Sequence, residues 1–257
     1  MIKINNPNCA ETKSVWMFLR VLAIKGYFLT PESKILDFGC KKGELVVLLR
    51  KMGFNAYGFD IHDFSESIEP EYRKYFFTIG SLNKDKSRYS VDWNKYRLPF
   101  NDNEFDFIYS RSVFEHIGDH DKVLSEINRV LKTPGVSIHK YQPRYAIMDT
   151  HSRVPFGGLF KNRYYFLFWA LCGLRNKRQA GKPVMEVVNI NLNTAIYNLN
   201  YVAPKNILRM AKKYFPSAKF IPQHWNFDNP LLKYCLKSRS IHNLYNNICK
   251  SILLLEK

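Results

Sequence analysis

The feature that most constrains the fold is residues 34–52, where a short apolar run, two glycines and an amphipathic run follow one another. The apolar run ends at Asp37 and predicts the exit of a buried strand. Gly39 and Gly43 predict a turn, and the apolar residues after Gly43 recur with helical spacing. A strand, a glycine turn and a helix in this order present backbone N–H groups and a helix N-terminus to a ligand at the carboxyl edge of a parallel sheet.

A second acidic residue indicates what this ligand contains. The next apolar run, residues 56–60, ends at Asp60, which lies 21 positions after Gly39. An acid at this distance from a glycine turn can accept hydrogen bonds from ribose hydroxyls. A dinucleotide would need G-x-G-x-x-G for its pyrophosphate, and Lys41 stands where the second glycine belongs. The residues therefore predict a nucleoside-containing cofactor other than a dinucleotide.

Four segments, in order, resemble one known family. Residues 37–43 (Asp-Phe-Gly-Cys-Lys-Lys-Gly) resemble the first motif of class I S-adenosylmethionine-dependent methyltransferases, usually D-x-G-C-G-x-G, with Lys41 in place of the middle glycine. Residues 98–110 are similar to that family's L-P-F…F-D segment, residues 114–117 to the helix after it, and residues 126–135 to its E-x-x-R-V-L-K-P-G-G segment. The order of the four motifs carries the resemblance, because each alone would be weak.

The resemblance implies an α/β fold, a doubly wound and mostly parallel sheet of the Rossmann-like methyltransferase type, with a helical and loop insertion after the fifth strand. We expect residues 1–141 to form the cofactor-binding core, residues 142–202 an acceptor-side insertion, and residues 203–257 to complete the sheet, all within one compact domain. The residues after Pro230 favour helix, so the antiparallel seventh strand of the family has no predicted position. The apolar runs predict strands at residues 54–60, 105–109, 136–141 and 218–221.

The resemblance also implies S-adenosylmethionine as the cofactor. The residues implied to bind it lie in the glycine turn and near the strand ends: Asp37, Phe38, Gly39, Cys40, Gly43, Asp60, Ile61, Asp92 and Ser110. Asp92, with Trp93 beside it, has the chemistry to hold an adenine amine and ring, but its loose spacing from Leu98 favours a surface loop.

Candidate catalytic residues follow from the chemistry. Methyl transfer from a sulfonium requires an aligned acceptor atom, and a hydroxyl acceptor is helped by a base that reaches its proton. His116 follows the fourth strand and His151 lies in the loop after the fifth, on the segments expected to flank the methyl group. We predict a base among His116, Asp149 and His151, although any single histidine, like His139 on the fifth strand, is more often structural. Asp149 and His151 alone do not make a metal site, so the sequence predicts no metal.

The charge is distributed unevenly. The chain carries a net charge of +17, and residues 141–257 hold 18 Lys and Arg against 4 Asp and Glu, a net of +14. Such a surface favours an anionic partner, either a phosphate-bearing acceptor, nucleic acid or an anionic membrane. The alternative is a generally basic proteome, which the heavy use of Lys, Asn, Ile and Tyr also indicates.

Cysteine usage and hydropathy bear on the compartment. The five cysteines are scattered and have no zinc or C-x-x-C spacing, which favours reduced thiols. The N-terminus lacks the apolar segment of a signal peptide, and the apolar run at residues 164–174 is too short to cross a bilayer. We expect a cytoplasmic protein, with peripheral membrane contact as an alternative.

The loop after the fifth strand, H-x-x-V-P-F from His151, resembles type 11-like methyltransferases of the small-molecule and glycan-tailoring subgroup. The leading hypothesis is therefore O-methylation of a sugar, glycan or other small-molecule acceptor. An RNA methyltransferase is the less favoured alternative, because the N-P-P-Y tetrad of base methylation is missing after the fourth strand. A third reading, motivated by Lys41, is a degenerate cofactor fold without catalysis.

Overall fold

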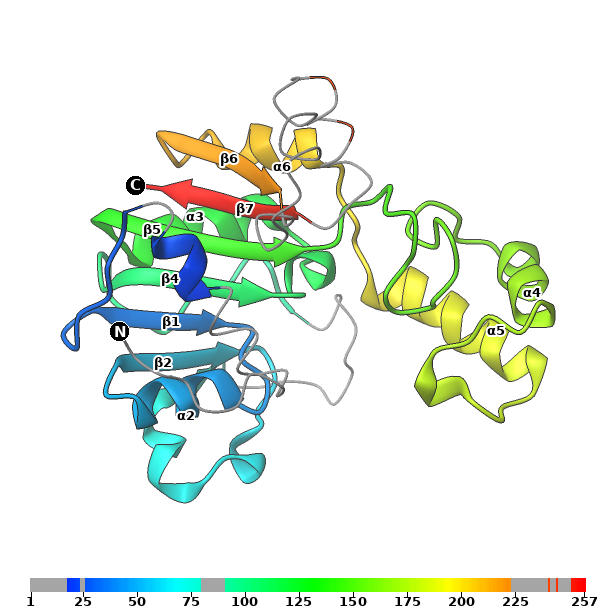
Figure 1. Cartoon of the computed structure of the whole chain (residues 1–257), viewed down its shortest axis with the longest axis horizontal. Coiled ribbons are helices and arrows are strands. Elements are labelled where there is room, and N and C mark those ends of the chain that lie inside the picture. The colour runs from blue at the N-terminus through cyan, green and yellow to red at the C-terminus, as the bar shows by residue number, and fades with distance from the viewer. Residues whose placement is uncertain (1–17, 24–25, 80–90, 223–239, 241–243, 245–250) are drawn as a thin grey trace.

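The structure is a computed structural model that describes residues 18–257 apart from 24–25, 80–90, 223–239, 241–243 and 245–250. Its described strands form one seven-stranded sheet in the order β3-β2-β1-β4-β5-β7-β6 (Figure 1). Neighbouring strands pair in parallel except β7, which is antiparallel to both β5 and β6. The strands are β1 (Lys34–Phe38), β2 (Asn55–Asp60), β3 (Phe76–Thr78), β4 (Phe105–Arg111), β5 (Leu131–Tyr141), β6 (Ser217–Pro222) and β7 (Ser251–Glu256). The predicted doubly wound, mostly parallel sheet is confirmed.

Helices cover both faces of the sheet. The regular helices are α2 (Glu44–Lys51), α3 (His120–Val130), α4 (Arg163–Leu171), α5 (Val184–Asn193) and α6 (Pro204–Ala211). Successive strand residues point to opposite faces, so Leu36 packs in the core with α3 and α6, while Ile35 packs with α2 and the helical residues 18–23. The amphipathic spacing of residues 12–28 predicts a helix that ends near Gly26, and residues 18–23 of this range are helical, whereas residues 12–17, 24 and 25 lie outside the described residues.

The seventh strand lies at Ser251–Glu256, at the C-terminal end of the chain, where the sequence analysis expected helix. That expectation was wrong for these residues. An apolar run of four (Ile252 to Leu255) fits a buried strand or a buried helix equally well by pattern alone. Pairing with β5 and β6 on its two sides decides the conformation, because it satisfies the backbone N–H and C=O groups that burial takes from water.

Two of the family-like segments are joined by one arginine. Glu126 accepts a hydrogen bond from the backbone N–H of Leu98 and pairs with Arg129 at 2.8 Å. Arg129 also donates to the carbonyls of Leu98 and Phe100 and pairs with Asp102 at 2.7 Å. The acid and arginine of α3 therefore hold the loop that leads into β4, which explains why the two segments occur together.

The segment between β5 and α6 leaves the sheet and forms a lobe around α4 and α5. Figure 1 shows this lobe beyond the carboxyl ends of the parallel strands. It has a hydrophobic cluster of its own, in which Phe166 and Ala170 of α4 pack against Val187 and Val188 of α5. The chain returns to the sheet through a π-helical turn, Thr194–Asn198. The lobe thus stands over the sheet edge where the sequence predicted the cofactor turn.

Several predicted boundaries shift by a few residues. The fifth strand begins at Leu131 instead of residue 136, because Leu131 already pairs with Phe105 of β4 before a register shift in the ladder. The helix expected from Val113 is a single 3-10 turn, η3 (Phe114–His116). Two other 3-10 turns, η1 (Ser65–Ser67) and η2 (Pro70–Tyr75), precede the short strand β3, and a fourth, η4 (Lys177–Gln179), lies in the lobe.

Candidate active site

The predicted cofactor turn joins β1 to α2 at the carboxyl edge of the sheet. Gly39 has a φ of +81°, and the N–H groups of Gly39 and Cys40 both donate to the carbonyl of Phe59 on β2, at 2.7 and 3.0 Å. A Cβ at Gly39 would lie 2.2 Å from the side chain of Val113. Glycine is therefore required twice at this position, for the left-handed backbone and for the close approach of the segment after β4.

Lys41 occupies the position where related motifs carry glycine, and its backbone conformation explains that preference. Its φ is +49°, in the left-handed region that glycine adopts most easily. Its backbone N–H donates to Oδ2 of Asp60 at 2.9 Å, and Oδ1 of Asp60 accepts from the N–H of His62 at 3.0 Å. The acid at the end of β2 thus orders the glycine turn as well as facing the cofactor edge.

Asp37 lies at the end of β1, buried and close enough to Asp60 to interact with it. Burial, followed by the negative charge of Asp60, raises the pKa of Asp37 to about 7. Cys40 beside it is half-buried, and loss of hydration, followed by the charges of Asp37 and Asp60, raises the pKa of its thiol well above the usual value. The two acids therefore give this edge negative charge, which favours a cationic ligand.

The remaining predicted cofactor residues are placed differently. Phe38 is buried and stacks on Phe59 with ring centroids 5.6 Å apart, so its side chain belongs to the core. Ile61 follows β2 and packs partly buried against the same core. Ser110 is fully buried, with its hydroxyl 2.8 Å from Nδ1 of His139, so this side chain is engaged inside the sheet.

Asp92 lies on an exposed loop that follows undescribed residues 80–90. Its carboxylate accepts a hydrogen bond from the N–H of Asn94 at 3.1 Å and lies 3.5 Å from the ammonium of Lys95. Trp93 beside it packs against Tyr96, with ring centroids 5.3 Å apart. These local contacts agree with the surface loop that its spacing favoured.

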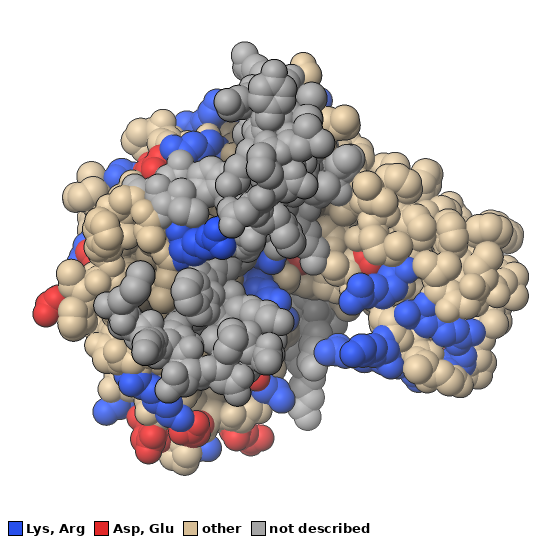
Figure 2. All heavy atoms as spheres, viewed as in Figure 1, with Lys and Arg blue, Asp and Glu red and all other residues tan. Residues whose placement is uncertain are grey.

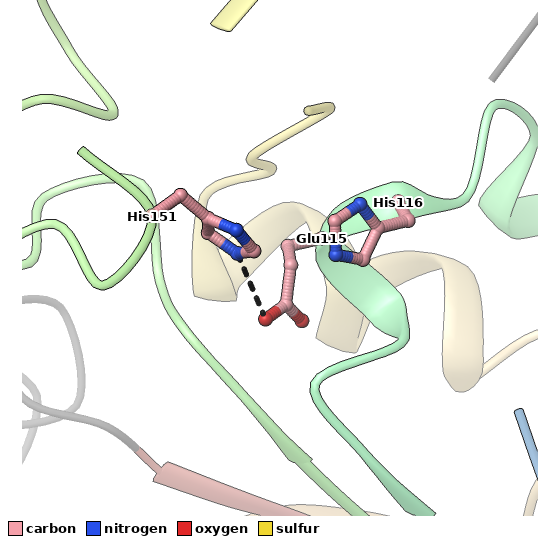
Figure 3. Close-up of side chains that lie close together, drawn as sticks. All are labelled: Glu115, His116 and His151. Atoms are coloured by element: carbon pink, nitrogen blue, oxygen red, sulfur yellow. Dashed lines mark ion pairs between the residues drawn. The ribbon is translucent and has the colours of Figure 1, made fainter. Parts of the chain in front are cut away.

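An acid and two imidazoles meet beside the cofactor turn. Figure 3 shows Glu115 and His116 from η3 and His151 from the loop after β5 converging on one another. Nε2 of His151 lies 3.8 Å from Oε1 of Glu115, and the rings of His116 and His151 stand nearly perpendicular with centroids 5.0 Å apart. Both histidines were predicted from the sequence, and the fold brings them into contact.

The surrounding backbone holds this cluster in place. Nδ1 of His116 lies 2.9 Å from the carbonyl of Asn198, and the N–H of Asn200 donates to the carbonyl of Glu115 at 2.7 Å. Burial lowers the pKa of His116, and the positive charge of Lys41 contributes in the same direction. The segment that returns from the lobe therefore holds η3 through Asn198 and Asn200. The charge of Lys41, in the turn after β1, contributes to the lowered pKa of His116.

Asp149, the third predicted catalytic residue, is buried and fully occupied with hydrogen bonds. Oδ1 accepts from the N–H groups of His151 and Ser152 and from the Ser152 hydroxyl, at 2.6–2.9 Å. Oδ2 accepts from the Tyr201 hydroxyl at 2.6 Å and from the side-chain amide of Gln142 at 3.0 Å. Five donors hold the two oxygens, so Asp149 organises the loop that carries His151.

Sequence reasoning missed Glu115. It is one residue before His116, but an acidic residue after a strand is usually solvated, whereas this side chain is 1% exposed. Tyr201 and Gln142 were missed as well, since their bonds to Asp149 span 52 and 7 positions. Only the adjacent Glu115 and His116 offered a signal, and nothing in the sequence indicated which way the Glu115 side chain points.

The sheet with its single antiparallel strand, the glycine turn after β1 and the acid after β2 define a class I S-adenosylmethionine-dependent methyltransferase. The family model described as methyltransferase domain matches residues 17–180, and the chain belongs to this family. The resemblance drawn from the four sequence motifs is thereby confirmed.

Two curated relatives are similar over part of their length. A sterol 24-C-methyltransferase of Schizosaccharomyces pombe is 31% identical over 109 residues, which are 42% of this chain and 27% of that protein. A demethylmenaquinone methyltransferase of Staphylococcus carnosus is 29% identical over 139 residues, 53% of this chain and 53% of that protein. The chain therefore spans about half or less of the length of these relatives.

Solved structures agree on the fold. A methyltransferase from Mesorhizobium loti aligns with a TM-score of 0.50 at 12% identity, covering 95% of this chain and 98% of that chain. Phosphoethanolamine N-methyltransferase 2 of Haemonchus contortus, solved with S-adenosylmethionine, aligns with a TM-score of 0.51 at 15% identity, covering 96% of this chain and 56% of that chain. At such identities the likeness shows the fold alone.

The cofactor of this class is S-adenosylmethionine, and the negative charge at this sheet edge suits it. The cofactor carries a sulfonium and an ammonium group, and the buried Asp37 and the neighbouring Asp60 supply negative charge at the sheet edge. Burial and the charge of Asp60 raise the pKa of Asp37, and a cation bound nearby would oppose both effects. The donor set is therefore compatible with the cofactor.

Proposed function

We propose that the protein transfers a methyl group from S-adenosylmethionine to a hydroxyl of a small-molecule acceptor that carries phosphate, such as a nucleotide-sugar or another glycan precursor. The observation that supports this most directly is the cluster of Glu115, His116 and His151 next to the cofactor turn. Val113 packs against Gly39, so η3 begins directly beside the residues proposed to hold the cofactor.

Asp37, Gly39, Cys40, Gly43 and Asp60 are the residues we propose to surround the cofactor. Phe38, Ile61 and Ser110 support this edge from the core, and Asp92 is the weakest of the candidates because its contacts are local. When bound, S-adenosylmethionine supplies the methyl group: an acceptor lone pair forms the new bond to carbon, the electron pair of the broken C–S bond stays on sulfur, and the acceptor loses its proton.

The chain's own contribution is to position the acceptor. His116 and His151 offer ring nitrogens to the acceptor hydroxyl and its proton. Asp149 acts on His151 through the backbone, because it holds the loop in which His151 lies. The low pKa of buried His116 keeps its ring neutral, and a neutral imidazole has a lone pair to offer.

Charge on the lobe favours a phosphate-bearing acceptor. Residues 142–202 hold eight Lys and Arg against two Asp and Glu. Figure 2 shows Lys and Arg side chains gathered on the side of the lobe that faces the rest of the molecule, beside a hollow. Arg153, Lys177 and Arg178 form no ion pair with any other described residue, so their charges are available to an anion.

A second role for the lobe, contact with an anionic lipid surface, is favoured by α4. Tyr164, Phe168 and Leu171 recur at helical spacing and are 81%, 57% and 68% exposed. Rings flanked by basic residues suit the boundary between headgroups and acyl chains. The described part of the chain contains no helix long and apolar enough to cross a membrane. Contact of this kind would bring the site to a membrane-linked acceptor.

The relatives do not select the acceptor, since one is a sterol 24-C-methyltransferase and another a demethylmenaquinone methyltransferase. The test is a transfer assay with methyl-labelled S-adenosylmethionine and four acceptor pools: nucleotide-sugars, quinols, small amines and total RNA. We expect label on a hydroxyl of a nucleotide-sugar. Label on RNA alone would support the alternative RNA methyltransferase, and binding of cofactor without transfer to any pool would support a degenerate fold.

A further inference from the structure

The cluster of Glu115, His116 and His151 has ligand atoms left without partners. Glu115 is 1% exposed, yet its Oε2 has no hydrogen-bond partner among the described residues. Nε2 of His151 is also buried without a hydrogen bond, and its 3.8 Å separation from Oε1 of Glu115 is too long to be one. A buried carboxylate and a buried imidazole nitrogen that face each other without a donor between them are costly, unless something else binds them.

His116 is oriented as a metal ligand would be. A carbonyl only accepts hydrogen bonds, so the 2.9 Å contact with Asn198 means that Nδ1 of His116 carries the proton. The lone pair of the neutral ring is then on Nε2. Histidines that bind metals usually donate their other ring N–H to a carbonyl or carboxylate, which fixes the tautomer and the ring orientation.

The separations are compatible with one ion. One ligand atom from each of the three residues lies within 4.8 Å of the others. Ligands of tetrahedral zinc, at about 2.1 Å from the ion, lie roughly 3.4 Å apart. The separations between ligand atoms would therefore need to shrink by up to about 1.4 Å, which changes of side-chain torsion angle in the half-buried His116 and His151 can supply.

We infer that Glu115, His116 and His151 form a binding site for one divalent transition-metal ion of the zinc type. Two imidazoles and a carboxylate are the donor set of several catalytic zinc sites, whereas magnesium prefers oxygen ligands alone. Three protein ligands leave a coordination position open. The sequence did not predict this site, because Glu115 and His116 lie about 35 positions before His151 and only the fold brings the three side chains together.

This inference deepens the proposed function and rests on it for the identity of the fourth ligand, which would be the acceptor oxygen. A bound ion would orient that oxygen beside the cofactor turn and lower the pKa of the hydroxyl, whose proton would pass to water. The two imidazoles would then serve as ligands instead of bases. Metal binding itself can be measured without any acceptor.

The experiment uses untagged full-length protein freed of metal with a chelator. Calorimetry with Zn²⁺ is expected to give one site per chain, with much weaker binding of Mg²⁺, and Co²⁺ is expected to develop visible bands on binding. Glu115→Gln and His151→Gln should each weaken Zn²⁺ binding by at least about tenfold. The matched controls His62→Gln and Glu186→Gln, which lie outside the cluster, should bind Zn²⁺ as the wild type does.

Binding of S-adenosylmethionine by each variant serves as the folding control. Stoichiometric Zn²⁺ binding that survives both Glu115→Gln and His151→Gln, or no binding by the wild type, would overturn the metal site. If the metal-free protein transfers methyl groups at the same rate as the Zn²⁺-loaded protein, the inferred role is overturned and the proposed function stands. If Zn²⁺ binds through these residues but no acceptor is methylated, the site stands and the proposed function fails.

Discussion

At the level of single residues, the cofactor edge combines two acids with an unusual lysine. Asp60 orders the turn through the N–H groups of Lys41 and His62 and has further lone pairs for ribose hydroxyls. Lys41 adopts a glycine-like φ, so its side chain is an addition to the motif that leaves the turn intact. The contribution of each to cofactor binding can therefore be separated.

Asp60→Ala is expected to weaken binding of S-adenosylmethionine, because each charge-assisted hydrogen bond lost costs roughly 1.5–3 kcal/mol. Calorimetry measures the affinity. Asp60→Asn serves as the comparison, since its amide keeps one oxygen to accept from the turn and should lose less. Unchanged affinity in Asp60→Ala would move the cofactor away from this edge.

Lys41→Gly keeps the backbone conformation and removes only the side chain, so the change in affinity reports what the ammonium does. We expect binding of S-adenosylmethionine to weaken by about tenfold, as for the loss of one charged contact to the methionine carboxylate. Lys42→Ala is the control for removing one nearby positive charge. Tighter binding by Lys41→Gly would show that the Lys41 side chain obstructs the site. Unchanged binding would show that the side chain neither contacts the methionine carboxylate nor obstructs the site.

His139 determines part of the acid sensitivity. It is fully buried between the hydroxyls of Ser110 and Ser137, and burial lowers its pKa to about 3, against 6.5 for an unperturbed histidine. The unfolded chain therefore binds a proton that the folded chain rejects, so stability is lost as the pH falls from about 6.5 toward 3. The slope is up to about 1.4 kcal/mol per pH unit within that window.

His139→Asn should reduce this acid-dependent loss, measured as the free energy of unfolding in urea between pH 4 and pH 8. The value at pH 8 isolates the packing cost of the substitution, since His139 is neutral in both states there. Asp37 acts in the opposite direction, because its raised pKa of about 7 lowers stability as the pH rises from about 4 to 7, and this contribution cancels between the two proteins. If the free energy of unfolding falls equally steeply with decreasing pH in the wild type and in His139→Asn, then His139 does not cause the acid sensitivity.

At the level of secondary-structure elements and loops, the segment that carries His151 depends on one buried acid. Asp149 joins the residues after β5 to Tyr201, beyond the lobe, and its backbone N–H bonds the carbonyl of Val154. The loop contains no regular secondary structure, so its backbone N–H groups are not satisfied by a strand or helix. The Asp149 carboxylate accepts hydrogen bonds from two of them instead. The position of His151 is therefore set by Asp149.

Asp149→Ala should lower the free energy of unfolding by roughly 3 kcal/mol, because it leaves several buried donors without an acceptor. Urea denaturation measures this loss. Asp63→Ala is the matched control, since Asp63 accepts one backbone hydrogen bond in an exposed turn and should cost well under half as much. Similar losses in the two variants would show that the Asp149 network is not structural.

At the level of the whole molecule, the sheet and the lobe differ in surface chemistry. Ten of the twelve large apolar side chains most exposed among the described residues, from Ile147 to Tyr197, lie in the lobe. By its length, the apolar run at residues 164–174 favours a buried helix somewhat over an interface. In the fold, Phe166 and Ala170 are buried and Tyr164, Phe168 and Leu171 are exposed, so one face of α4 packs in the lobe and the other face is open to a partner.

The wild type should co-sediment with anionic liposomes at low salt and much less at high salt, because surface attraction decays over about 10 Å at 0.1 M salt. The double variant Phe168→Ser with Leu171→Ser should bind more weakly. Phe28→Ser, which removes an even more exposed ring outside the lobe, is the control. Absence of binding to anionic liposomes at low salt would exclude the lipid surface and leave acceptor phosphate as the reason for the charge.

The sequence by itself determined the sheet type and the glycine turn after β1, and it singled out the two histidines that the fold brings together. These rest on local patterns, since a strand, a glycine turn and a helix need only neighbouring residues to be recognised. The division into residues 1–141, 142–202 and 203–257 stays a prediction.

Tertiary structure alone decided the strand conformation of Ile252 to Leu255, which depends on β5 and β6 lying on either side. It also decided that Glu115 turns inward to meet His151, 36 positions further along the chain, and that five donors converge on Asp149. In each case a buried polar group is paired with a group that is distant in the sequence. Only the folded sheet and the lobe bring such groups together.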